Sequence, residues 1–276
     1  MRRIKTHTVE KLVYFKKYIE AYLVATKRLP IKYYIDAFAG SGTCILCDKK
    51  CKSKGNLRCL RCGKGKLIDG SAMISLRTKN HFSGYLFADL NKNCINDLEK
   101  CIKKLDKSLQ KKIVIEKSDA NIILKKIYKY IPKYSGCLIF LDPEGSELKW
   151  ETIKYLSKIN KVDILMLYPY DMALVRLTKN YRGKLDKFYG SKDWIKIYKD
   201  KKYSNPDKRK QALLDFYIKN LKELGFKYFA YEQIRRKLRS GNPLYHLILV
   251  SHHPLAKKIM TNIFNIELDG QKKFKF

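Results

Sequence analysis

Apolar and polar positions along the chain follow two alternating patterns. Residues 6–27 predict an amphipathic helix capped by a threonine, because apolar side chains recur there at helical spacing: Leu12, Phe15, Ile19, Tyr22 and Leu23. Short apolar runs typical of buried strands follow at Tyr33–Asp36, Tyr85–Asp89, Ile113–Lys117, Cys137–Asp142 and Ile164–Tyr168. Amphipathic segments that predict helices lie between them, at about 91–108, 119–131 and 147–159.

This alternation predicts a mostly parallel sheet with helices on both faces. Two further strands, Phe226–Ile234 and Tyr245–Ser251, flank the turn-like segment Ser240–Pro243 and would close the sheet as an antiparallel pair. Two segments interrupt the pattern. We therefore predict one α/β domain over residues 1–276, with a cysteine-rich insertion at 44–67 and a basic, aromatic-rich insertion at 169–210.

The charge balance of the chain is strongly basic. Sixty lysines and arginines against 26 acids give a formal net charge of +34. Such an excess favours a polyanionic partner, RNA or DNA, over an enzyme that handles only small neutral substrates. No apolar run approaches 18 residues and no apolar signal core follows the basic N-terminus, so the sequence predicts a cytoplasmic protein without a membrane span.

The stretch Tyr34–Gly42 carries the strongest signal for a nucleotide cofactor. An apolar strand runs into a turn in which Gly40 and Gly42 let the backbone approach a ligand, and Asp36 stands beside that turn. The next strands also end in acids. Asp89 is placed to accept hydrogen bonds from ribose hydroxyls and Asp119 from a purine amino group, and each is also a candidate helix N-cap.

At these residues the sequence resembles class I S-adenosylmethionine-dependent methyltransferases, and within them the three-Cys-motif partner protein family. The matching segments are His7–Leu12, Tyr34–Gly42, Asp69–Ser71, Phe140–Gly145, Tyr168–Pro169 with Arg176, and Leu247–Pro254. They cover the predicted sheet and its first helix but neither insertion. The resemblance implies a Rossmann-like fold with a seven-stranded, mostly parallel sheet.

The resemblance also implies a role for each matching residue. The methionine part of S-adenosylmethionine would be lined by Asp36, Phe38, Gly40 and Gly42. Asp89 would hold the ribose and Asp119 the adenine amino group, while Asp142 would face the methyl acceptor. NAD is a weaker alternative, because the residues after Gly42 do not complete the Gly-x-Gly-x-x-Gly spacing.

The candidate catalytic segment is Asp142-Pro143-Glu144. Many enzymes that methylate base amino groups use Asp/Asn-Pro-Pro-aromatic, in which the carboxylate and a backbone carbonyl hold the amino group and the aromatic ring stacks on the base. Here Glu144-Gly145 replace the second proline and the aromatic residue. Tyr168 or Tyr170 could supply the stacking face or be packing residues. Glu144 is either a base or the cap of a helix beginning near Ser146.

Cytosine C5 methylation would need a nucleophilic cysteine after the proline. None is present, and Cys137 lies inside a predicted strand, where a core position is expected. A base amino nitrogen is therefore the slightly favoured acceptor.

Cys44-x-x-Cys47 and Cys59-x-x-Cys62 predict a structural zinc site of the ribbon type. Each pair can form a tight turn that presents two thiolates to one tetrahedral ion. Cys51 is a fifth candidate ligand, and an iron–sulfur cluster is the alternative. The basic residues around the cysteines indicate that the insertion also presents a phosphate-binding surface.

The second insertion and Arg235–Arg239 are expected to follow a phosphate backbone, with aromatic side chains interleaved for exposed bases. The sequence thus predicts a methyltransferase acting on RNA or DNA. The alternative is a catalytically inactive, nucleic-acid-binding partner subunit of the same fold, which would work with another protein. A metal-dependent nuclease is a third alternative, which no clustered Asp/Glu/Lys signature supports.

Overall fold

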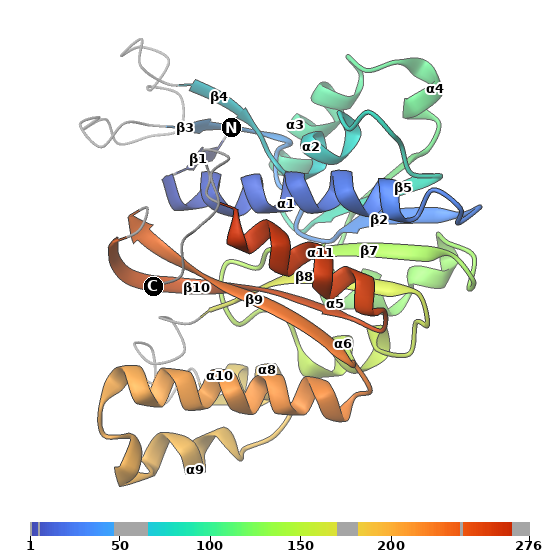
Figure 1. Ribbon diagram of the computed structural model, residues 1–276. Coiled ribbons are helices and arrows are strands. Elements are labelled where there is room, and N and C mark those ends of the chain that lie inside the picture. Colours follow the sequence, from blue (N-terminus) through green and yellow to red (C-terminus); the bar gives the residue numbers. More distant parts are fainter. Residues whose placement is uncertain (1, 5, 47–65, 170–181, 238–239, 267–276) are drawn as a thin grey trace.

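The computed structural model describes residues 2–4, 6–46, 66–169, 182–237 and 240–266. A seven-stranded sheet in the order β6-β5-β2-β7-β8-β10-β9 forms its centre (Figure 1). Its strands are β2 (Lys32–Asp36), β5 (Gly84–Asp89), β6 (Ile113–Lys117), β7 (Gly136–Leu141), β8 (Val162–Tyr168), β9 (Tyr228–Lys237) and β10 (Ser240–Ser251). β10 is antiparallel to both of its neighbours, and the other pairs are parallel.

The sheet confirms the seven-stranded, mostly parallel α/β fold expected from the sequence. All of the predicted strands are present, with ends shifted by up to three residues in most cases. The exception is the start of β10, because Ser240–Pro243 was expected to form a turn and is instead part of that strand. The central strands β2 and β7 are neighbours, and the chain extends outward from them in opposite directions.

Helices cover both faces of the sheet because side chains alternate along each strand. On β2, Tyr34 belongs to one buried cluster and Ile35 to the other. The cluster around Tyr34 is covered by α1 (Thr6–Ala25), α2 (Ser71–Leu76), α3 (Lys92–Ile102), α4 (Lys107–Gln110) and α11 (Pro254–Asn265). The cluster around Ile35 is covered by α5 (Ala120–Lys125), η1 (Ile127–Lys129), α6 (Trp150–Leu156), α8 (Arg182–Tyr189), α9 (Trp194–Lys199) and α10 (Pro206–Glu223).

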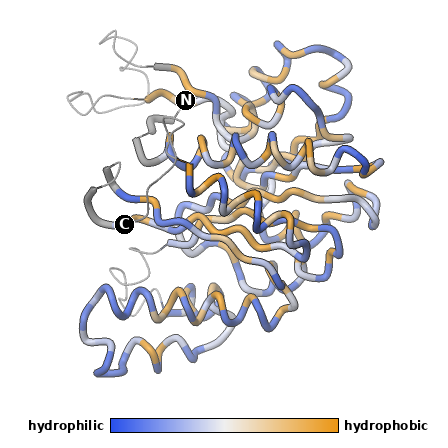
Figure 2. The backbone as a smooth tube through the Cα atoms, viewed as in Figure 1, coloured by the Kyte–Doolittle hydropathy of each residue, from blue (hydrophilic) through white to orange (hydrophobic). Residues whose placement is uncertain are grey.

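Figure 2 shows the same division by hydropathy, with hydrophobic positions gathered along the central strands and hydrophilic positions on the outer helices. None of the helices in the described ranges is both long enough and apolar enough to cross a membrane.

A second, three-stranded sheet carries the cysteine-rich insertion, and the sequence did not predict it. β3 (Thr43–Leu46) and β4 (Lys66–Asp69) pair antiparallel at the two ends of the insertion. β1 (Arg2–Ile4) adds to β3 in parallel. Figure 1 shows this small sheet beside the beginning of α1. The insertion is therefore attached to the segment that directly follows Gly42 and to the segment that leads into α1.

The described part of the basic, aromatic-rich segment 169–210, from Arg182 onward, forms helices that pack against one face of the sheet. It includes α8, α9, η3 (Lys201–Tyr203) and the beginning of α10. Phe188, Tyr189 and Trp194 are buried, and the Phe188 ring stacks on Tyr217 of α10 at 5.0 Å between centroids. The expectation that these aromatic side chains contact exposed bases was therefore wrong for these three residues. Tyr170 and Tyr181 lie outside the described residues.

Candidate functional site

The turn after β2 depends on its two glycines. Gly40 and Gly42 have φ of 61° and 75°, the left-handed region that other residues rarely adopt. A Cβ at Gly42 would come within 2.9 Å of Leu98 Cδ1, so packing as well as backbone conformation requires glycine there. A Cβ at Gly40 would meet nothing within 4 Å. The loop is thus tightly packed at Gly42, while the space beside Gly40 is open for a ligand.

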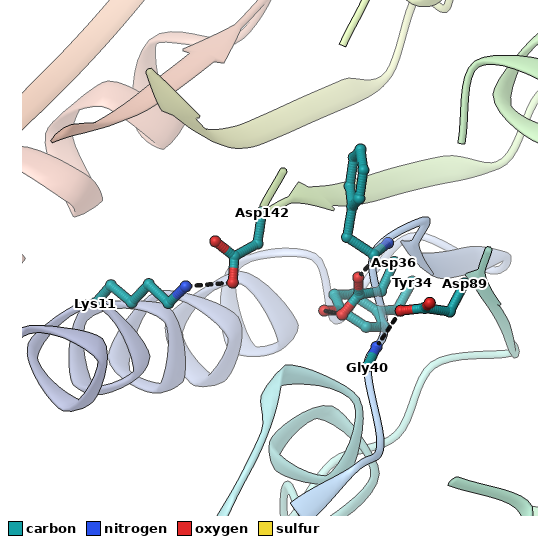
Figure 3. A network of polar contacts seen from close by, with 7 residues as sticks. Lys11, Tyr34, Asp36, Gly40, Asp89 and Asp142 are labelled. Atoms are coloured by element: carbon teal, nitrogen blue, oxygen red, sulfur yellow. Dashed lines mark hydrogen bonds and ion pairs between the residues drawn. The ribbon is translucent and has the colours of Figure 1, made fainter. Parts of the chain in front are cut away.

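Asp36 ends β2 and is fully buried (Figure 3). Its carboxyl group accepts hydrogen bonds from the Tyr34 hydroxyl at 3.2 Å and the Phe38 amide at 3.1 Å, and from the Ser71 hydroxyl. Burial raises the pKa of Asp36 to about 7, against these hydrogen bonds, which lower it. Asp36 therefore stabilises the start of the glycine turn through its hydrogen bond with the Phe38 amide. Its contact with a cofactor stays a prediction.

Asp89 connects the glycine turn to the end of β5. Its Oδ2 accepts a hydrogen bond from the Gly40 amide at 2.9 Å (Figure 3). Its Oδ1 accepts one from the Asn91 amide at 2.8 Å. Asn91, not Asp89, caps α3. The next residue, Leu90, is 68% exposed. The glycine turn, the half-buried Asp89 carboxylate and the exposed Leu90 are therefore neighbours at the end of β5. The sequence pattern did not indicate Leu90.

Asp119 caps α5, as one of its two interpretations predicted. Its Oδ1 accepts hydrogen bonds from the amides of Asn121 and Ile122. The Asn121 side chain in turn holds the segment after β7: its amide group donates to the Glu147 carbonyl at 3.0 Å and accepts from the Lys149 amide at 2.8 Å. The adenine contact of Asp119 stays a prediction. The helix that Asp119 caps holds the loop after Asp142 through Asn121.

Asp142 follows β7 and forms an ion pair with Lys11 of α1 (Figure 3). The Lys11 side chain is 9% exposed and that of Asp142 is 25% exposed. The Lys11 ammonium also lies 5.9 Å from the centroid of the Tyr245 ring. The sequence pattern did not single out Lys11 or Tyr245, although Lys11 stands in one of the matching segments.

The other candidates after β7 differ in exposure. Pro143 is buried and Glu144 is exposed. α6 begins at Trp150 with Lys149 at its N-cap position, so the expectation that Glu144 caps a helix beginning near Ser146 was wrong. A role of Glu144 as a base stays a prediction.

Tyr168 is a packing residue, one of the two alternatives expected for it. It is buried at the end of β8, and its hydroxyl shares a hydrogen bond of 2.8 Å with the Tyr189 hydroxyl. Its ring packs against Phe188 and Tyr217. Tyr168 could not stack on a base without leaving this cluster.

Of the predicted zinc ligands, only Cys44 lies in the described part of the chain, on β3. Cys47, Cys51, Cys59 and Cys62 lie outside it. Within the described ranges, no three His, Cys, Asp or Glu side chains are grouped so that they could hold a metal ion. The zinc site therefore stays a prediction. Cys137 is buried in β7, where burial raises its pKa to about 12, as expected of a core thiol.

Comparison with solved structures extends the fold assignment. Protein LPL1258 from Legionella pneumophila str. Philadelphia 1, described with the family-model DUF519, is similar over 92% of both chains, with 15% identity and a TM-score of 0.54. Weaker similarities are to an rRNA methylase from Streptococcus thermophilus (9% identity, 86% of this chain and 92% of that chain, TM-score 0.42) and to the METTL16 MTase domain (11%, 87% and 66%, TM-score 0.44). Neither a protein-family model nor a curated protein sequence matches the chain.

The strand order agrees with a Rossmann-like architecture. In chain order the strands are arranged 3-2-1-4-5-7-6, with the seventh antiparallel, and the first five places are those of the dinucleotide-binding sheet. In open α/β sheets, ligands bind beyond the carboxyl ends of the strands where the strand order reverses. Here the strand order reverses between β2 and β7. The glycine turn, Asp89 and Asp142 all lie at the carboxyl ends of the strands at this point.

Proposed function

We propose that this protein is an S-adenosylmethionine-dependent methyltransferase that acts on nucleic acid. The observation that carries the proposal is the placement of the Gly40–Gly42 turn, Asp89 and Asp142 at the carboxyl ends of adjacent strands β2, β5 and β7. Ligands of open α/β sheets bind at this edge, and groups on adjacent strands there can hold a nucleotide cofactor and a second substrate next to each other.

The cofactor half of this edge fits S-adenosylmethionine. The open space beside Gly40 admits the methionine part, with Asp36 and Phe38 at the base of the turn. Asp89 is positioned to accept hydrogen bonds from ribose hydroxyls, and the exposed Leu90 offers an apolar surface for adenine, with Asp119 at the next strand end. When bound, the cofactor supplies a methyl group on a sulfonium.

The acceptor half, formed by Asp142, Pro143 and Glu144, suits an acceptor group that must be oriented and deprotonated during methyl transfer. Asp142 is the carboxylate that would accept an N–H from a base amino group, with the Pro143 carbonyl as a second acceptor and Glu144 as the candidate base. Lys11 fixes the orientation of the Asp142 carboxylate through the ion pair. A base amino nitrogen is the acceptor that this arrangement favours.

The charge of the chain supports a nucleic-acid substrate, RNA or DNA. With a net charge of +34, binding to a phosphate backbone would release many counterions and weaken steeply with added salt. Exposed lysines stand at the carboxyl edge itself, at the start of α3 (Lys92), the end of β6 (Lys117) and the start of α6 (Lys149). The cysteine-rich insertion, mounted on β3 and β4, would add a zinc-stabilised basic surface.

The proposal is tested by incubating the purified, metal-quantified protein with tritiated S-adenosylmethionine and, separately, total RNA and genomic DNA. We expect label to enter one of the two nucleic acids, and digestion to nucleosides to identify an N-methylated base. Boiled protein and the Asp142→Asn variant are the controls. Labelled nucleosides carrying a C-methyl group would contradict the amino-nitrogen acceptor, and label in neither nucleic acid would contradict the activity.

The alternative is an inactive partner subunit of the same fold, related to the three-Cys-motif partner proteins. The observation that favours it is the Glu144-Gly145 pair, which replaces the second proline and the aromatic residue expected of an amino-methylating enzyme. Binding of S-adenosylhomocysteine and RNA without any methyl transfer, even after addition of a cell extract as a source of a second protein, would favour this alternative.

A further inference from the structure

Tyr245 stands at the same edge of the sheet as Asp142, although it lies more than a hundred residues away in the sequence. In the register of β10 with β8, His246 is opposite Tyr168, the last residue of β8. Tyr245 is therefore the first residue of β10 beyond the end of β8, and it pairs with Ile234 of β9. The β9–β10 pair thus extends past the carboxyl edge of the parallel strands and carries Tyr245 with it.

The contacts of Tyr245 connect it to the acceptor half of the edge. Lys11, whose ammonium lies over the Tyr245 ring, is the residue that pairs with Asp142. Burial raises the pKa of the Tyr245 hydroxyl, and the nearby carboxylates of Asp142 and Glu10 raise it further. Tyr245 is neither fully buried nor fully exposed. The Tyr245 side chain is thus partly buried next to Lys11 and keeps some exposed surface.

The segment after β7 lacks the aromatic residue with which many amino-methylating enzymes hold the acceptor base. Glu144-Gly145 occupy that place, and Tyr168 is held in a buried aromatic cluster. A base presented to Asp142 still needs an apolar surface against one of its faces, because stacking is the main sequence-tolerant way to hold an extruded base. Within the described part of the chain, Tyr245 offers a partly exposed aromatic side chain next to Lys11, the residue that pairs with Asp142.

We propose that Tyr245 is the residue on which the acceptor base stacks. The aromatic surface that this fold usually takes from the segment after the fourth strand comes here from the antiparallel hairpin. This inference rests on the proposed function: Asp142 holds the amino edge of a base whose face lies on Tyr245. The Lys11 ammonium fixes both groups, because it contacts the carboxylate and the ring together.

Two variants separate the ring from the hydroxyl. Tyr245→Phe keeps the stacking surface, and Tyr245→Leu replaces the ring with an apolar side chain that still fills space. Tyr231→Leu is the matched control, because Tyr231 is an exposed tyrosine on β9 of the same hairpin, paired with Ile248 within the sheet. Melting temperature and affinity for S-adenosylhomocysteine are measured for all three, to separate a folding defect from a loss of base contact.

For the nucleic acid that the wild type methylates, we expect Tyr245→Leu to lower kcat/KM about tenfold or more, the loss expected for one stacked base. Tyr245→Phe and Tyr231→Leu should stay within about twofold of the wild type. Affinity for S-adenosylhomocysteine should be unchanged in each variant. A Tyr245→Leu protein that is folded and as active as the wild type would overturn the inference.

A second experiment does not depend on turnover. Short single-stranded RNA and DNA of random sequence, containing 5-iodouridine or its deoxy form, are irradiated with the protein, and the cross-linked peptide is identified by mass spectrometry. We expect an adduct on Tyr245 that is lost in Tyr245→Leu and kept in Tyr231→Leu. Adducts confined to other residues would overturn the inference. A Tyr245 adduct in a protein without methyl transfer would support the base contact of Tyr245 and contradict the proposed activity.

Discussion

In the proposed cofactor half of the carboxyl edge, Asp36 and Asp89 accept hydrogen bonds from backbone amides of the glycine turn and its neighbours, whereas in the proposed acceptor half Asp142 is paired with the side chain of Lys11. The first arrangement is built from residues close to the strand ends. The second joins β7 to a helix more than a hundred residues earlier in the chain. The carboxylates of Asp36 and Asp89 are thus held by backbone amides near the strand ends, whereas the orientation of Asp142 depends on a side chain from a distant part of the sequence.

A substitution in the glycine turn should have the largest effect on the proposed cofactor half. We expect Gly42→Val to destabilise the protein by about 3–5 kcal/mol, because the positive φ disfavours a branched side chain and the new atoms would overlap Leu98. Urea denaturation measures the change. Gly40→Ala is the control, since it has a similar φ but open space, and it should cost about 1–2 kcal/mol. Equal losses for the two variants would contradict the packing argument.

Asp36 should make the stability of this half depend on pH. Its pKa in the folded protein is about 7, against an ordinary value of 3.8, so the folded state holds the proton more tightly than the unfolded state. The resulting stabilisation is complete below about pH 4 and is lost as the pH rises through about 7, with an upper limit of roughly 4 kcal/mol.

The measurement for Asp36 is the free energy of unfolding of the wild type and of Asp36→Asn, by urea denaturation from acid to neutral pH. The neutral asparagine removes the titration, so the wild type should lose stability relative to the variant as the pH rises. A difference that stays constant over this range would show that Asp36 titrates near its ordinary pKa.

Asp142→Asn should separate the two halves most clearly. We expect methyl transfer to fall by about 100-fold, the loss typical of a misplaced reacting group, while affinity for S-adenosylhomocysteine stays within about twofold. Asp97→Asn, on the outer part of α3, is the control and should change neither quantity. If Asp142→Asn weakened cofactor binding as much as turnover, the division into two halves would be wrong.

Lys11→Met tests the ion pair that holds the acceptor half. Its side chain is 9% exposed, so we expect a loss of about 2 kcal/mol in the free energy of unfolding, more than for a surface pair and less than for a fully buried one. Arg77→Met, which removes the exposed pair with Asp69, is the matched control and should cost less than about 1 kcal/mol. Urea denaturation compares the two, and equal costs would contradict a structural role for the Lys11–Asp142 pair.

The placement of the residues proposed to bind the cofactor could largely be predicted from the sequence, because these residues follow one another at strand ends. Asp36, Gly40, Gly42 and Asp89 were all found where an apolar strand ends in a glycine or an acid. The sheet could also be predicted from a local pattern, because buried strands alternate with amphipathic helices along the sequence.

The acceptor half could not be assembled in this way. Lys11 and Tyr245 reach Asp142 only through the packing of α1 and the extension of β10, and neither follows from a local pattern. The prediction for Phe188, Tyr189 and Trp194 was wrong for a related reason. A helix whose aromatic face is buried has the same composition as one whose aromatic face is exposed, and only the packing of α8 and α9 against α10 distinguishes them.

The most direct test of the account is calorimetric titration of the wild type and Asp89→Ala with S-adenosylhomocysteine. We expect micromolar binding to the wild type, and binding at least about tenfold weaker in Asp89→Ala, because hydrogen bonds to a charged group are lost. The melting temperature of each protein shows whether it is folded. A folded wild-type protein that does not bind S-adenosylhomocysteine would contradict the cofactor site and, with it, the proposed methyltransferase activity.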